Sequence, residues 1–216
     1  NKGIKNYFKM LTNSISNDTK TLVNINKKYA NFHMLIDLYK SKGSRPIPLS
    51  LIYSLSERDV NNGFGNGVKL NLYNKLKVNR ALSPITITET KFDGSEYEYV
   101  RVGNTNYYKN DIEHTLIFDC WNSYEIDDSW LHLTDKYSNK YTYNYHYLTY
   151  PQKIELKNGN VFNLNVNSSK INEINDNEKE KITFEYKENS TVIKVNYNSI
   201  EIYRIELYFD NDANLT

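Results

Sequence analysis

Apolar and polar residues alternate along most of this chain. Residues 32–38 and 49–53 show the pattern best, because every second position in them is apolar or aromatic. A period of two is typical of strands that bury one face and leave the other in water. From Thr21 onward the pattern therefore predicts an all-β fold, with antiparallel sheets built from successive hairpins.

The phase of the apolar residues predicts the register of two hairpins. A three-residue loop that ends at Gly159 pairs Ile154 with Phe162 and places the glycine where a left-handed conformation is needed. Further along the chain, a loop of even length pairs Phe184 with Ile193. Both registers keep the apolar residues of the two strands on one face.

Three other segments are less regular. Between residues 85 and 102, two tyrosines (Tyr97 and Tyr99) compete with two valines (Val100 and Val102) for the inner face, and the sequence leaves both alternatives open. The apolar residues at 200–202 and 205–209 have opposite phases. We therefore expect a bulge or a turn near Tyr203-Arg204. Residues 172–181 are polar and charged, which predicts an exposed loop.

The pattern also suggests how the chain is organised. Residues 1–20 are weakly patterned and are expected to form an N-terminal extension. Tyr7, Met10 and Leu11 have the spacing of a short helix, and a loose terminus or an incoming strand is an equal alternative. Residues 21–216 contain no proline- or serine-rich linker and are expected to form a single all-β domain, either a closed sandwich or part of a longer strip of sheet. No apolar run approaches the ~20 residues of a membrane span. No signal peptide is visible, and the abrupt start and stop predict a segment of a longer polypeptide.

The composition excludes some partners. With 27 basic and 26 acidic residues the net charge is +1, so no overall positive field attracts nucleic acid or an anionic membrane. The single cysteine, Cys120, excludes an intrachain disulfide. Asparagine, lysine, isoleucine and tyrosine are abundant, which indicates an AT-rich bacterial genome.

No catalytic site, cofactor or metal is predicted. The four histidines (His33, His114, His132 and His146) are scattered, without the spacing of a zinc site. Cys120 would be a nucleophile only beside a positioned base, which the sequence does not indicate. We therefore expect Cys120 to be a small buried residue.

Two acidic groups have a catalytic or metal-binding interpretation and a structural one. Asp119, Glu125, Asp127 and Asp128 could supply a carboxylate pair for glycoside chemistry, but acidic residues are also common in turns. Asp210-x-Asp212-x-Asn214 matches the first ligands of a calcium loop, yet the glycine and the distal glutamate of such a loop are missing. A hairpin turn is therefore the favoured interpretation.

The aromatic residues of the central region are the best candidates for binding. They are Trp121, Tyr124, Trp130, Tyr141, Tyr143, Tyr145 and Tyr147. The last four alternate along one predicted strand and would form a stripe on one face. An exposed stripe would stack on sugar rings or bind a protein, whereas a covered stripe would pack against other strands. Packing is the favoured alternative.

A glycine-rich joint separates two of the alternating segments. Pro48-Leu49-Ser50-Leu51-Ile52-Tyr53 precedes it, and Gly63-Phe64-Gly65-Asn66-Gly67 forms it. Beyond the joint, residues 68, 70, 72 and 74 are expected on one face of a strand. Because the glycines lead into a strand and no Lys-Ser/Thr follows them, we expect the joint to bend the backbone and to bind no phosphate.

Three segments repeat one plan, in which a strand, a polar turn and a second strand rich in tyrosine or phenylalanine follow each other. They are residues 85–102, 131–147 and 182–197, and residues 208–216 resemble the start of another unit. A single hairpin is marginally stable and gains stability by joining a sheet. The repeat therefore predicts a scaffold of stacked hairpins.

These hairpins, the Tyr/Phe-Asp turn near the C-terminus and the glycine-rich joint together resemble the rearrangement-hot-spot (RHS) or YD-repeat proteins. Such proteins carry Pro-Leu-Ser-Leu-x-Tyr-(Asn/Ser)-Ser followed by Gly-Phe-Gly-x-Gly-Trp-x-Leu-Asn-Leu. The matching residues here are Pro48, Leu49, Ser50, Leu51, Tyr53, Gly63, Phe64, Gly65, Gly67, Leu70, Asn71 and Leu72. Val68 replaces the tryptophan, and the downstream repeats lack most of the usual glycines. The resemblance covers residues 22–216, and its specific part is about thirty residues long.

The resemblance implies a non-catalytic structural module near the start of a shell or scaffold that encloses or displays other domains. The whole protein would be a secreted or cell-surface bacterial protein of the wall-associated or toxin type. Its partners would be downstream repeats or domains of the same polypeptide, and a glycan or protein at the cell surface. Two other function classes stay open: a carbohydrate- or surface-binding adhesion module with an exposed aromatic stripe, and a hydrolase with convergent carboxylates.

Overall fold

The structure is a computed structural model. It describes residues 21–26, 31–40, 48–91, 96–105, 107–110, 115–119, 130–135, 137–144, 148–167, 169–176 and 179–214. Residues 1–20, for which the sequence leaves a short helix, a loose terminus and an incoming strand open, lie outside this set. Contacts divide the chain into two compact units, the first formed by residues up to 71 and from 179 onward, the second by residues 72–178. A single domain over residues 21–216 stays a prediction.

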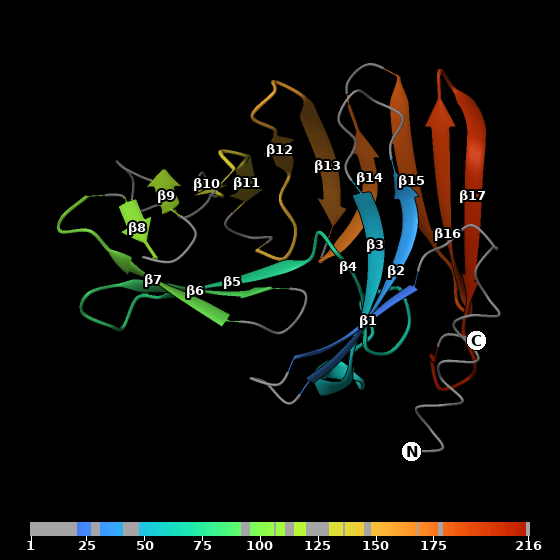
Figure 1. Cartoon of the computed structure of the whole chain (residues 1–216), viewed down its shortest axis with the longest axis horizontal. Coiled ribbons are helices and arrows are strands. Elements are labelled where there is room, and N and C mark those ends of the chain that lie inside the picture. The colour runs from blue at the N-terminus through green and yellow to red at the C-terminus, as the bar shows by residue number, and fades with distance from the viewer. Residues whose placement is uncertain are drawn as a thin grey trace. The chain divides into compact units, whose positions relative to one another are not determined.

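The described part of the chain is all-β, as the alternation predicts (Figure 1). The strand pairs whose residue-by-residue register the described residues define are all antiparallel. The helical content of these residues is one short 3-10 segment, η1 (Leu55–Glu57). A search of the same residues for a helix long and apolar enough to cross a membrane finds none.

The first unit contains two groups of strands in chain order. The four-stranded group is β1 (Thr21–Asn26), β2 (Asn31–Lys40), β3 (Pro48–Ser54) and β4 (Val68–Leu70). The second group is β15 (Glu180–Tyr186), β16 (Ser190–Tyr197) and β17 (Ile200–Tyr208). The unit is therefore assembled from two stretches of chain more than a hundred residues apart.

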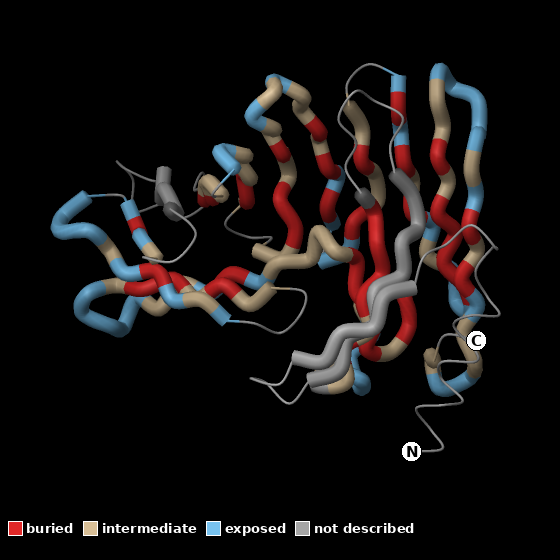
Figure 2. The backbone as a smooth tube through the Cα atoms, in the orientation of Figure 1, coloured by how far each residue is buried: buried red, intermediate tan, exposed pale blue. Residues whose placement is uncertain are grey.

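The second unit consists of strands that each pair with their neighbours in sequence. They are β5 (Asn74–Asn79), β6 (Thr86–Lys91), β7 (Glu96–Arg101), β8 (Tyr107–Lys109), β9 (Thr115–Asp119), β10 (Trp130–Thr134), β11 (Lys140–Asn144), β12 (Lys153–Glu155), β13 (Val161–Asn167) and β14 (Lys170–Asn175). One apolar cluster of this unit draws residues from β5 to β8, β10 and β11. Figure 2 shows the underlying alternation, which is clearest along β13.

Strand β5 closes part of the second unit onto itself. The Asn74 N–H donates to the Thr149 carbonyl at 2.7 Å, and the Leu76 N–H donates to the Leu148 carbonyl at 2.9 Å. The rings of Tyr73 and Tyr150 meet edge to face just beyond these bonds. Residues 148–149 follow β11 in the chain. Their hydrogen bonds to β5 therefore connect the last strand of the run β5–β11 back to the first, and they cover the edge of β5 that does not pair with β6.

The hairpin registers expected from phase are confirmed. Ile154 pairs with Phe162 across a turn in which Gly159 has a φ of 90°. Phe184 pairs with Ile193 across the shorter turn between β15 and β16. The inner face of β7, which the sequence left open, carries Tyr99. Val100 and Val102 are exposed.

The bulge expected near Tyr203-Arg204 is present. Val195 pairs with Tyr203, but Asn196 pairs with Glu201, so Ile202 is the extra residue. The bulge does not bury the first apolar set, because Ile200 and Ile202 are both exposed, whereas Ile205 and Leu207 are buried.

The exposed loop expected at residues 172–181 is wrong for most of its length. This stretch contains the end of β14 and the start of β15. A register shift leaves Asn172 without a partner across the ladder, so Ile171 and Ile174 are both buried although they lie three positions apart. The bulge conceals the period of two from a reading of the sequence.

Candidate functional site

The glycine-rich joint is a compact loop that returns the chain from β3 to β4. We define the glycine loop as residues 61–67. The Ser54 N–H donates to the Gly67 carbonyl at 2.8 Å, and the Gly67 N–H donates to the Val60 carbonyl at 2.9 Å. Inside the loop, the Gly63 N–H donates to the side-chain oxygen of Asn61 at 2.8 Å. The backbone amides that a phosphate would need are therefore in part used by the loop itself.

Two glycines of this loop are required by their surroundings as well as by backbone conformation. Gly63 has a φ of +98°, and a Cβ there would lie 2.8 Å from Cδ1 of the Tyr186 ring. Gly67 has a φ of +74°, and a Cβ there would lie 2.7 Å from Cε2 of the Tyr53 ring and 3.1 Å from the Arg58 Cα. Any larger residue is strained at these positions and displaces an aromatic ring.

The loop clasps the strands at the other end of the sequence. Phe64 is fully buried, and its ring meets the rings of Phe184 and Tyr186 edge to face, each with centroids 6.0 Å apart. The buried hydroxyl of Thr191 donates to the Gly63 carbonyl at 2.5 Å. The glycine loop therefore joins the β3–β4 hairpin to β15 and β16, and we call these contacts the clasp.

A second set of bonds joins the loop to the turn after β17. The Asn66 N–H donates to the Ala213 carbonyl at 2.8 Å, and its side-chain Nδ2 donates to the Asp212 carbonyl at 2.7 Å. One asparagine therefore holds two successive carbonyls of the C-terminal turn.

The hairpin around the loop is well packed. Leu49, Leu51 and Leu70 are buried. Lys69 is also buried and forms an ion pair with Glu57 of η1. Its burial was not expected, because a lysine between two apolar residues usually faces water.

Residues 68, 70, 72 and 74 were expected on one face of one strand, but only Val68 and Leu70 belong to the same strand. Strand β4 ends at Leu70, and the chain turns before β5 begins. Asn71 marks the end of the ladder: its N–H donates to the Ser50 carbonyl at 2.9 Å, and its side-chain oxygen, in place of its carbonyl, accepts from the Ser50 N–H at 3.1 Å. Leu72 is half-buried beyond this turn, and Pro48 is the first residue of β3.

Replacing Gly63 by alanine should separate the effect of the ring contact from that of backbone strain. We expect a loss of about 2 kcal/mol in the free energy of unfolding. Gly159→Ala is the matched control, because Gly159 has a φ of +90° but no atom lies within 4 Å of the place that an alanine methyl group would take. That variant should lose about 1 kcal/mol. Equal losses in urea denaturation would contradict a clasp at Gly63.

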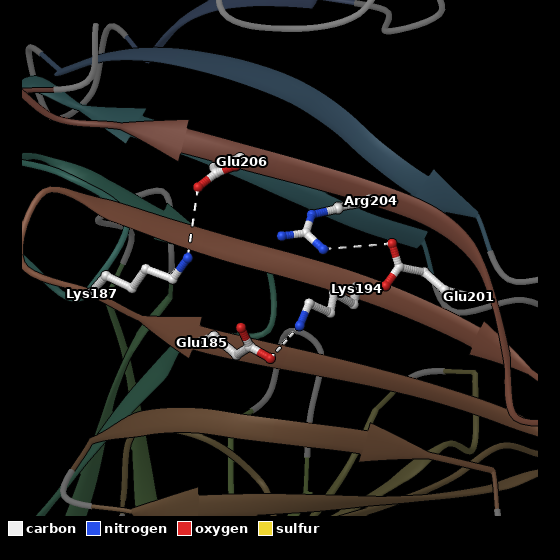
Figure 3. Close-up of polar contacts among 6 residues, drawn as sticks. All are labelled: Glu185, Lys187, Lys194, Glu201, Arg204 and Glu206. Atoms are coloured by element: carbon white, nitrogen blue, oxygen red, sulfur yellow. Dashed lines mark hydrogen bonds and ion pairs between the residues drawn. The ribbon is translucent and has the colours of Figure 1, made fainter.

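The outer face of β15–β17 is charged. Three ion pairs lie across it (Figure 3). They join Lys194 to Glu185 at 2.5 Å, Lys187 to Glu206 at 3.9 Å and Arg204 to Glu201 at 3.8 Å. Such exposed pairs contribute little stability, but charges of both signs keep this face in water and direct the apolar face of the strands toward the clasp.

The second unit contains a buried polar network that sequence analysis missed. Glu89 on β6 is 1% exposed and accepts hydrogen bonds from the Tyr99 hydroxyl and, at 2.6 Å, from the Asn74 side-chain amide. The same amide reaches the Tyr143 hydroxyl at 3.2 Å. Asn74 therefore holds the carboxylate with its side chain and residue 149 with its backbone. The sequence held one indication of this burial: Glu89 is two positions from Ile87 and so lies on the same face of the strand as that buried residue.

This network and its neighbours raise the pKa values of three tyrosines. Burial, and then the Glu89 carboxylate, raise the pKa of Tyr99 and of Tyr143 above the usual value of 10. Burial, and then the Asp135 carboxylate to which its hydroxyl donates, raise the pKa of Tyr141 to about 12. All three hydroxyls are thus protonated at neutral pH. Those of Tyr99 and Tyr141 donate to carboxylates, and that of Tyr143 accepts from the Asn74 amide.

The raised pKa values predict a loss of stability at alkaline pH. Tyr141 binds its proton more tightly in the folded chain than in the unfolded chain, so its contribution is constant below about pH 10 and is lost between about pH 10 and 12. The loss should reach about 2–3 kcal/mol for Tyr141. Urea denaturation at increasing pH measures it. Tyr141→Phe should reduce the slope, whereas Tyr137→Phe, which changes an exposed ring in the turn before β11, should not.

The candidate aromatic residues do not share one environment. Tyr143 is 1% exposed and packs in the apolar cluster, Tyr141 is half-buried, and Trp130 is 37% exposed. The remaining candidates (Trp121, Tyr124, Tyr145 and Tyr147) lie outside the described residues. In the part of the stripe that the structure describes, packing therefore dominates over exposure.

The residues considered for catalysis or metal binding are in part described. His132 Nδ1 lies 2.9 Å from the Thr142 hydroxyl. Asp210 lies in a turn and accepts from the backbone N–H groups of Asp212 and Asn214. A hairpin at this turn stays a prediction, because the described residues end at Asn214. Cys120 and the acidic residues at 125, 127 and 128 lie outside the described residues. Within the described ranges, no three histidine, cysteine or acidic side chains gather as metal ligands do.

Comparison with known proteins gives no family for this chain: no family model matches it, and neither does any curated protein.

Proposed function

We propose that this chain is a non-catalytic structural β module of a larger secreted or cell-surface bacterial polypeptide of the RHS-like type. Its role is to contribute to a shell or scaffold that encloses or displays other domains. It acts by joining strands, first within itself and then with downstream repeats of the same polypeptide.

The observation that carries this proposal is the clasp. Gly63 and Phe64 have structural partners, Tyr186 and Phe184 among them, and Tyr53 covers Gly67. A motif whose residues are used for packing fits a scaffold better than a site that binds and converts a small molecule.

The arrangement of the hairpins gives further support. Residues 85–102, 131–147 and 182–197, which look alike in sequence, each contain one antiparallel pair: β6–β7, β10–β11 and β15–β16. Repeated units that pair with their sequence neighbours can be extended without a change of plan.

The full reading frame tests the proposal. We expect it to continue past Thr216 with further hairpins that carry tyrosine-aspartate turns. Electron microscopy of the whole purified protein should then show a β-rich wall around or beneath other domains. A reading frame without downstream repeats, or a whole protein in which this module stands apart from any scaffold, would contradict the proposal.

Trp130 supports a second candidate function, carbohydrate or surface binding. It is 37% exposed at the start of β10 and lies on the same strand face as His132. Exposed tryptophans stack on sugar rings. A glycan array probed with the chain and with Trp130→Ala tests this function. Hits that the variant loses would support it, and an array without hits would exclude it for the glycans tested.

A further inference from the structure

Two turns of this chain, Asp135–Asn139 and Asp210–Asn214, have the same hydrogen-bond pattern. In each, the aspartate N–H donates to the carbonyl of the asparagine four residues later, at 3.0 Å and 2.9 Å. The aspartate carbonyl accepts from the N–H of the residue three positions later, at 3.0 Å in both turns. That residue, Ser138 in the first turn and Ala213 in the second, has a positive φ, 66° and 61°.

The aspartate side chain does the same work in both turns. One carboxylate oxygen accepts from the N–H groups two and four residues later, at 2.9 Å and 2.9 Å in the first turn and at 2.9 Å and 2.8 Å in the second. The asparagine side chain donates back to the carboxylate in each case. In the second turn these donors lower the pKa of Asp210, the Asn214 N–H first. The two turns are therefore one device used twice.

The first of these turns joins β10 to β11. Thr134 pairs with Lys140 directly after the turn, and Leu133 pairs with Tyr141. The bond from the Asp135 N–H to the Asn139 carbonyl lies at the head of this ladder. The same turn after β17 should direct the chain back along β17 in the same manner.

Alternate N–H groups of β17 point away from β16, as pairing with a further strand requires. The Phe209 N–H donates to the Asn189 carbonyl and so points toward β16. Because successive residues of a strand point to opposite sides, the N–H groups of Glu206 and Arg204 point away from β16. The Asp210 N–H has this outward parity, and its bond to Asn214 is the first rung on the outer side. Among the described strands, β17 pairs with β16 alone.

The glycine loop fixes the direction of this turn. Asn66 holds the Asp212 and Ala213 carbonyls through two hydrogen bonds. The turn is thereby attached to the folded unit at a second place, which reduces the entropy lost when a following strand docks.

We propose that the outer edge of β17 is the docking edge for the polypeptide that follows Thr216, which returns as an antiparallel strand in the register set by the Asp210–Asn214 turn. This inference rests on the proposed function, because it names the partner of the scaffold. The register places position 218 opposite Glu206 and position 220 opposite Arg204, as hydrogen-bonded pairs. Positions 217 and 219 lie opposite the buried Leu207 and Ile205 and should be apolar.

Amide hydrogen exchange of two chains tests the proposal. One chain ends at Thr216, and the other continues through about eight residues of its own reading frame. The amides of Glu206 and Arg204 should exchange at least ten-fold more slowly in the longer chain. Those of Leu207 and Ile205, which point toward β16, should be protected in both and serve as internal controls.

Asp210→Ala in the longer chain removes the carboxylate that organises the turn, and should return the Glu206 and Arg204 amides toward the faster rates. Asp135→Ala is the matched variant and should change exchange only in β10 and β11. Unchanged exchange at Glu206 and Arg204 in the longer chain would overturn the docking proposal while leaving the scaffold function in place. Slow exchange in the shorter chain that becomes slower still as protein concentration rises would assign the edge to a second copy instead, and would also overturn it.

Discussion

Phe64→Ala should lower the free energy of unfolding by about 3–5 kcal/mol, because it removes a fully buried ring from the clasp. The cavity would lie between the glycine loop and the rings of Phe184 and Tyr186. Urea denaturation measures the loss. Hydrogen exchange should show that β15 and β16 lose protection together with β3 and β4, since the ring connects the two groups of strands.

Phe162→Ala is the control for this experiment. Phe162 is also a buried phenylalanine, at 6% exposed, but it lies on β13 in the second unit. Its loss should be of similar size and should leave the protection of β3 and β4 in place. If Phe64→Ala loosened β15 without affecting β3, the ring would be a local core residue and the clasp would be disproved.

Asn74→Ala should have the second largest effect, a loss of about 3 kcal/mol. The substitution removes the amide that donates to the buried Glu89 carboxylate and to the Tyr143 hydroxyl. A carboxylate that is 1% exposed then keeps the Tyr99 hydroxyl but loses a donor that water cannot easily replace. Urea denaturation at neutral pH measures the effect.

Asn79→Ala is the matched control, because it changes the same residue type on the same strand. Asn79 donates to the hydroxyls of Thr86 and Thr88, both at 3.1 Å, and these acceptors are neutral. Its loss should be about 1 kcal/mol. In a Glu89→Gln background the cost of Asn74→Ala should fall. An undiminished cost would mean that Asn74 acts through its neighbours in the turn and not through the carboxylate.

The parts of the fold that sequence reasoning predicts are local. Ile154 pairs with Phe162 because turn length and apolar phase agree within nine residues. The bulge in β17 is visible in sequence for the same reason, since both of its flanks are apolar. At Asn172 the only apolar residues nearby are Ile171 and Ile174, three positions apart in a polar stretch. Two such residues are too few to reveal the bulge, and the strand is mistaken for a loop.

The clasp and the buried network could not be predicted, because they depend on long-range contacts. Thr191 and Gly63 are 128 residues apart, and Asn74 and Tyr143 are 69 residues apart. The sequence showed that glycines bend the backbone at the joint, but not which rings cover them. Glu89 was detectable only as a charged residue with an apolar phase, and a single such residue does not identify its partners.

The first unit is built from the two ends of the chain, and this has a consequence for synthesis on the ribosome. The glycine loop is made early, but its partners on β15, β16 and the last turn emerge only after residues 72–178. Residues 72–178 can therefore acquire their contacts first, while the early hairpin waits with Phe64 uncovered. Slowing translation near residue 179 would prolong this wait, and a chaperone that shields aromatic side chains should act on the nascent chain during that interval.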